Sequence, residues 1–166
     1  MVSEQLPPPS PDLVLTSLTG QSRTLREWLT MFHMATVVVD PYTNESAWIL
    51  DTAARILHQF SGAAVRVNWL ITCGADEART FLGPYATDFL VFVDPDRIAV
   101  KALGLHELPA FVLVQADGTI SAHAQGWTAE SWRHVSNTIA TLTNWSSPSI
   151  PAPGDPATFR GTAALV

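Results

Sequence analysis

The chain has 166 residues, of which 47% are hydrophobic, so it is large enough for one domain that buries roughly 70% of its unfolded surface. Its formal net charge is −6, and its nine basic residues, which include the single lysine Lys101, form no cluster. Such an acidic surface repels phosphate backbones and anionic lipids, so we expect no nucleic-acid partner.

Twelve prolines divide the chain, and most of them lie near its two ends. They predict a compact domain over residues 11–145, a proline-rich N-terminal segment over 1–10 and a proline-rich C-terminal tail over 146–166. Trp145, Ile150 and Phe159 are candidates for pinning the tail onto the domain or onto a second subunit. A flexible tail is the alternative.

The first half of the domain alternates between strand and helix patterns. We expect a strand near residues 13–18, then a helix over 24–32 with Thr24 as its N-cap and Phe32 on its inner face. The apolar run 36–39 predicts a central strand. Helical spacing then extends from Trp48 to Phe60, and Gly62 is expected to end that helix.

The second half continues the alternation and closes with a hairpin. It predicts a strand over 65–71, a helix over 75–82, a strand over 89–93, a helix begun by Asp94 and Pro95, and a last helix capped by Thr128. Between the last two helices, Asp117-Gly118 predicts a hairpin turn between strands. This order indicates an α/β protein with a mixed central β-sheet and helices on both faces.

One stretch carries a specific resemblance: Phe92-Val93-Asp94-Pro95-Asp96, Ala102-Leu103-Gly104-Leu105, Leu108-Pro109-Ala110-Phe111, Asp117-Gly118-Thr119-Ile120 and Gly126. With these motifs, residues 11–142 resemble the redoxin branch of the thioredoxin-like superfamily, which includes peroxiredoxins and bacterial thiol-disulfide proteins of cytochrome maturation. The resemblance implies a thioredoxin-like fold with an N-terminal redoxin-type extension. It also implies that Pro109 is the family's cis-proline, beside which an extended peptide can pair with an unpaired backbone edge.

The active-site motif of that family is degenerate in this chain. Peroxiredoxins read Pro-x-x-x-Thr-x-x-Cys, whereas counting from Pro41 places Glu45 at the threonine and Trp48 at the cysteine. A dithiol needs two sulfurs, and Cys73 is the only cysteine, so a disulfide cannot form within the chain. The sequence therefore favours a protein that is neither a peroxidase nor a disulfide reductase of the family's type.

The candidate site is a groove beside the expected cis-proline, and the residues assigned to it are Tyr42, Asn44, Glu45, His106, Leu108 and Pro109. Asn44 is expected to cap the helix that follows, with Glu45 in its first turn. The five histidines show no ligand spacing, so neither a metal nor another cofactor is predicted.

Three functions remain open at this point. The first is a redox-inactive protein that binds a peptide or protein partner in the groove. The second is a single-cysteine thiol enzyme or redox sensor that uses Cys73. The third is a structural homodimer subunit. Residues 1–5 lack the basic and apolar stretches of a secretory signal, and no apolar run approaches the roughly 18 residues of a membrane helix, so a cytoplasmic location without membrane contact is expected.

Overall fold

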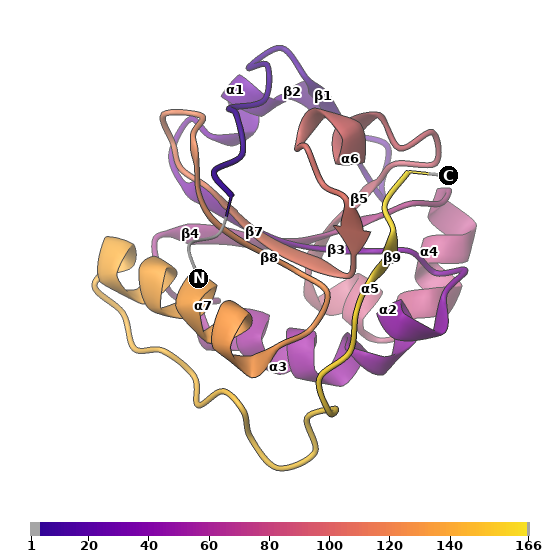
Figure 1. Ribbon diagram of the computed structural model, residues 1–166. Coiled ribbons are helices and arrows are strands. Elements are labelled where there is room, and N and C mark those ends of the chain that lie inside the picture. Colours follow the sequence, from indigo (N-terminus) through magenta and orange to yellow (C-terminus); the bar gives the residue numbers. More distant parts are fainter. Residues whose placement is uncertain (1–3, 166) are drawn as a thin grey trace.

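The computed structural model describes residues 4–165 and is built around one seven-stranded mixed sheet (Figure 1). Its strands are β1 (Val14–Ser17), β2 (Ser22–Thr24), β3 (His33–Val39), β4 (Val65–Ile71), β5 (Leu90–Val93), β7 (Ala110–Val114) and β8 (Ile120–Gln125). They lie in the order β2-β1-β5-β4-β3-β7-β8. A separate two-stranded sheet joins β6 (Glu107–Leu108) to β9 (Thr162–Ala163).

The three central strands β3, β4 and β5 run parallel, and each strand outside them pairs antiparallel with its neighbour on the side of the sheet centre. In β3, six of the seven side chains are buried, which explains why its sequence is a continuous apolar run rather than an alternation. Helices connect the parallel strands, as parallel pairing requires. The predicted mixed sheet is therefore confirmed.

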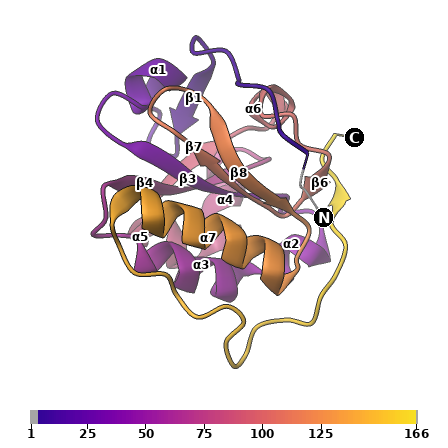
Figure 2. The same ribbon diagram turned by 60° about the vertical axis from the view of Figure 1, so that its left-hand side comes forward.

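Helices cover both faces of the sheet (Figures 1 and 2). They are α1 (Leu25–Trp28), α2 (Asn44–Trp48), α3 (Leu50–Gln59), α4 (Ala75–Leu82), α5 (Tyr85–Asp88), α6 (Ile98–Ala102) and α7 (Ala129–Thr143). The larger core lies between the sheet and α3 and α7, and the smaller core lies between the sheet and α1 and α6. Because successive strand residues face opposite ways, Val37 joins the first core and Val38 the second.

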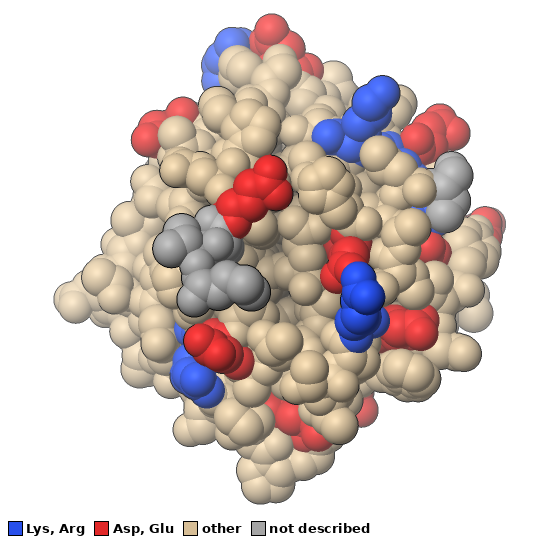
Figure 3. Space-filling view, viewed as in Figure 1, with Lys and Arg blue, Asp and Glu red and all other residues tan. Residues whose placement is uncertain are grey.

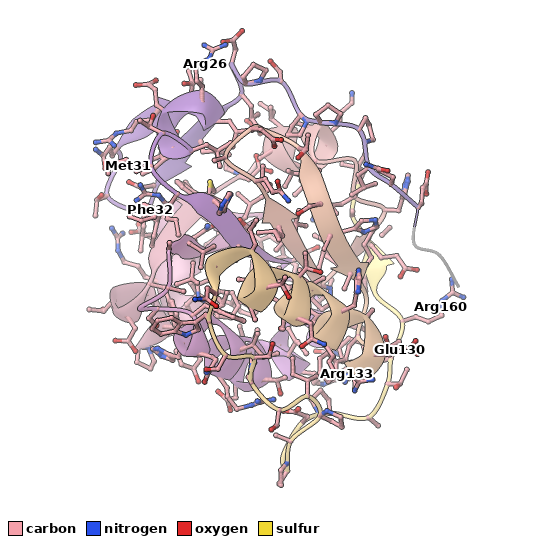
Figure 4. All side chains as sticks on the ribbon, turned by 90° about the vertical axis from the view of Figure 1, so that its left-hand side faces the viewer. Arg26, Met31, Phe32, Glu130, Arg133 and Arg160 are labelled. Carbon is pink, nitrogen blue, oxygen red and sulfur yellow. The ribbon has the colours of Figure 1, made fainter. Side chains whose placement is uncertain are left out.

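Several expected elements have the predicted bounds and caps. The structure has β4 and α4 at the predicted residues, and Thr24 and Thr128 are N-caps whose hydroxyls accept from backbone amides three residues on. The first helix is shorter than predicted, because it ends at Trp28 and the chain then turns into β3. Phe32 is consequently 37% exposed rather than on an inner face, and Figure 4 shows it at the surface beside Met31.

Two other helices begin elsewhere than the sequence predicted. The helix expected from Trp48 is two helices, α2 and α3, that meet at Ile49, and the second has its C-cap at Phe60 before Gly62 is reached. The helix expected to begin at Pro95 begins at Ile98, which is 63% exposed. Its N-cap is Arg97 rather than Asp94, but the Asp94 carboxylate still accepts from the amides of residues 99 and 100 in the first turn.

The proline-rich tail lies against the domain, as expected if its aromatic and apolar residues pin it there, and not as a flexible tail. The indole of Trp145 donates to the carbonyl of Gln59 at 2.6 Å, and Ile150 is 5% exposed. Asp155 forms an ion pair with Arg55 at 2.8 Å, with its own side chain only 4% exposed. These contacts fasten the tail as far as residue 156, and the segment beyond crosses the carboxyl edge of the sheet (Figure 2).

The charges of the surface are dispersed on the face that Figure 3 shows, where basic side chains are few and lie among acidic ones. None of the helices within residues 4–165 is both long and apolar enough to cross a bilayer.

Candidate functional site

The candidate site lies where the parallel strands end. Asp40 follows β3, and Thr72 and Cys73 follow β4, so their side chains meet at one edge of the sheet. Val38 in β3 pairs with Ala110 in β7, which brings the Leu108–Pro109 peptide bond to the same edge. This bond is cis. Ligands of open α/β sheets gather at the carboxyl ends of the strands, which makes this edge the natural place for a binding site.

A buried ion pair occupies the centre of the edge. A guanidinium nitrogen of Arg97 lies 2.8 Å from a carboxylate oxygen of Asp40, and the two side chains are 13% and 5% exposed. The other terminal nitrogen of Arg97 donates to the carbonyl of Ala164 at 2.7 Å. Arg97 therefore connects the end of β3 to the C-terminal segment, a role that no sequence motif indicated.

The helix α2 that follows β3 begins one residue earlier than predicted. Thr43 is its N-cap, so the prediction that Asn44 caps it is wrong. The hydroxyl of Thr43 donates to the carbonyl of Asp40, and the buried hydroxyl of Ser46 accepts from the Asp40 amide at 2.9 Å. Asn44 is exposed, and Glu45 lies half-buried in the first turn. These bonds fix the turn between β3 and α2 without a ligand.

Cys73 lies beside acidic groups and is only 2% exposed. Burial raises the pKa of its thiol to about 11, and the negative charges of Glu77 and Asp40 act in the same direction. Tyr42 belongs to the same cluster, because its hydroxyl donates to Glu77 and this bond raises the pKa of Tyr42 to about 12. The thiol is therefore protonated at neutral pH, the opposite of an activated nucleophile.

The backbone beside Pro109 is already paired with another part of the chain. Glu107 and Leu108 form β6, which pairs antiparallel with β9. The backbone carbonyl of His106 accepts from the Ala164 amide at 2.9 Å, whereas the imidazole of His106 is exposed. The ring of Phe159 packs edge-on against Trp48, with 5.4 Å between ring centroids.

The sequence-predicted residues therefore separate into two groups. His106, Leu108 and Pro109 lie along the C-terminal segment, whereas Tyr42 lies with Cys73. Within residues 4–165, no group of three or more His, Cys, Asp or Glu side chains is arranged to hold a metal ion.

No family model and no curated protein sequence matches this chain, but solved structures do. A secreted Mycobacterium tuberculosis disulfide oxidoreductase homologous to E. coli DsbE is 20% identical, with a TM-score of 0.62 over 79% of this chain and 96% of that chain. A putative thiol:disulfide interchange protein DsbE from Chlorobium tepidum is 15% identical, with a TM-score of 0.68 over 86% and 99%. The Xanthomonas campestris bacterioferritin comigratory protein is 16% identical, with a TM-score of 0.66 over 89% and 100%. These likenesses, together with the strand order of the sheet, show that this chain has a thioredoxin-like fold.

Proposed function

We propose that this chain is a redox-inactive binding protein that takes up an extended peptide of a protein partner along β6, beside Pro109. The observation that carries the proposal is the pairing of Glu107 and Leu108 with an extended strand of the chain itself. An edge that accepts one strand offers the same amides and carbonyls to another, because main-chain hydrogen bonds supply the contact. No thiol takes part in this form of recognition.

Thiol chemistry has little support in this site. The similar solved structures are named for disulfide exchange and alkyl peroxide reduction. Both chemistries begin with a thiolate. In this chain, counting from Pro41 in the peroxiredoxin motif places Trp48 at the cysteine position, and the one thiol, Cys73, is buried with a raised pKa. The hypothesis of a Cys73 enzyme or sensor therefore has no observation in its favour.

The remaining hypotheses concern the partner and the place of action. A homodimer and a cytoplasmic location stay predictions. The acidic surface, with a formal net charge of −6, supports a protein or peptide partner over a nucleic acid.

A selection from a random peptide library tests the proposal. The bait is a chain that ends at Pro156, which lacks β9, and a matched bait carries Pro109→Ala as well. We expect the first bait to enrich peptides that slow hydrogen exchange at the amides of residues 106–108, and the second to lose that enrichment. Failure to enrich any peptide at this edge would refute the proposal.

A further inference from the structure

The segment 157–165 passes the end of the sheet, and within it Thr162 and Ala163 pair with Leu108 and Glu107 of β6 (Figures 1 and 2). Its first contact is a mutual backbone pairing of Phe159 with Trp127, at 3.0 and 3.1 Å. Pairing of β9 with β6 follows, and the Ala164 amide donates to the carbonyl of His106. The segment thus uses the backbone groups that a bound peptide would use.

The fit of the segment to the edge is close at one position. A Cβ on Gly161 would lie 2.7 Å from the carbonyl oxygen of Leu108 and 2.9 Å from the Cβ of Glu107. Gly126 faces it, since a Cβ there would lie 3.0 Å from the Gly161 amide nitrogen. The backbone of the segment therefore touches the backbone of β6 at Gly161, and a side chain larger than hydrogen at this position forces the segment away from β6.

Side-chain contacts hold the segment at two points that flank this glycine. The Phe159 ring packs against Trp48, and Ala164 is fully buried with its carbonyl bound by Arg97. Arg160 lies between them with its side chain 94% exposed, and one of its guanidinium nitrogens is 3.6 Å from a carboxylate oxygen of Glu107 (Figure 4). The hydroxyl of Thr162 donates to the carbonyl of Leu108 at 3.4 Å. The positions that packing constrains are therefore an aromatic residue at 159, glycine at 161 and a small residue at 164.

The chain is fastened before this segment by contacts that do not depend on the segment. The carbonyl of Pro156 accepts from the indole of Trp127 at 2.8 Å, and Asp155 is buried in its ion pair with Arg55. Residues 157, 158, 160, 163 and 165 are exposed, and β9 has two residues. The segment can consequently leave the edge while the preceding stretch stays in place.

We propose that residues 157–165 are a built-in competitor that closes the partner-binding edge. A partner displaces them by presenting an extended peptide with the same pattern of aromatic residue, glycine and small residue. This inference rests on the function proposed above and adds the chemistry of the ligand and the regulation of the site. Because the segment is tethered, its effective concentration at the edge is in the millimolar range, so a segment with a dissociation constant of its own of about 0.1 mM or tighter weakens the binding of a free peptide at least about tenfold.

Fluorescence anisotropy with a labelled peptide of residues 156–165 tests the inference on four proteins. They are the full chain, the full chain with Gly161→Val, the matched control Ala157→Val at an exposed position, and the chain that ends at Pro156. We expect the peptide to bind the Gly161→Val and shortened chains at least tenfold more tightly than the other two. The same peptide with valine in place of glycine is expected to bind none of them.

The outcomes separate this inference from the proposed function. If the labelled peptide binds all four proteins equally, or binds none of them, the inference that the segment is a competitor is overturned. Enrichment of library peptides at residues 106–108 by the shortened chain would still support the binding function in either case.

A second measurement uses the unmodified chain and does not depend on how the variants fold. The Ala164 amide should exchange its hydrogen faster than the amides of β3, through opening of the segment alone. Exchange of Ala164 only through global unfolding would overturn the inference.

Discussion

The ion pair between Asp40 and Arg97 yields the sharpest test of the site's energetics. Arg97→Met keeps an unbranched side chain but removes the guanidinium, and leaves a carboxylate that is 5% exposed with the Tyr42 amide as its remaining partner. Removing one partner of a buried pair costs about 3 kcal/mol at the lower end of the measured range, and that end applies because the amide still binds the carboxylate. For a chain of this length the melting temperature should fall by roughly 6–12 °C.

The assay is urea unfolding followed by tryptophan fluorescence for the wild type, Arg97→Met, Asp40→Asn and the double variant. The double variant leaves no unpaired buried charge, so its loss of stability should be smaller than the sum of the single losses by about 2 kcal/mol. A loss below about 1 kcal/mol in Arg97→Met, or losses that add, would refute the reasoning.

Four further predictions concern neighbouring parts of the structure. With a pKa of about 11, Cys73 should react with iodoacetamide at pH 8 roughly 200-fold more slowly than glutathione-like thiols with a pKa near 8.5. A comparable rate would contradict the conclusion that burial raises the pKa of this thiol. Because this pKa is raised in the folded state, the thiol's contribution to stability is complete below about pH 8.5 and is lost as the pH rises to 11, so wild-type stability should fall more steeply over that interval than that of Cys73→Ala. Double-mutant analysis of Trp48→Ala and Phe159→Ala should give a coupling of about 1 kcal/mol, and additive effects would mean that the rings do not interact in solution. Asp155→Asn should lose about 2 kcal/mol and expose residues 146–156 to proteases, whereas an unchanged cleavage pattern would show that the ion pair with Arg55 does not fasten the tail.

Local patterns predicted the centre of the sheet because strands such as β3 and β7 are buried on both faces and read as apolar runs. The strand 65–71 and the helix 75–82 also have the predicted bounds, and a glycine directly follows the helix. The polar strand β2 and the four-residue helix α5 carried no such pattern, because three or four residues are too few to show a period. Helical spacing predicted one helix from Trp48 to Phe60, but the chain breaks at Ile49, and Trp48 ends the first helix in contact with Phe159.

The site was harder to predict because its contacts join distant parts of the sequence. The resemblance implied a cis bond at Pro109, and the Leu108–Pro109 bond is cis, but the backbone edge that it implied to be unpaired is paired with β9. Arg97 and Gly161 act through geometry: one reaches two partners from a left-handed backbone position, and the other allows two backbones to touch. Neither property leaves a motif in a single sequence.

The assay that tests the central claim most directly is insulin reduction in dithiothreitol by the full chain and by the chain that ends at Pro156. If the site works by strand pairing alone, neither protein should accelerate insulin aggregation beyond dithiothreitol by itself, even with the edge uncovered. Acceleration by the shortened chain at the rate of an active thioredoxin, lost on Cys73→Ser, would contradict the account.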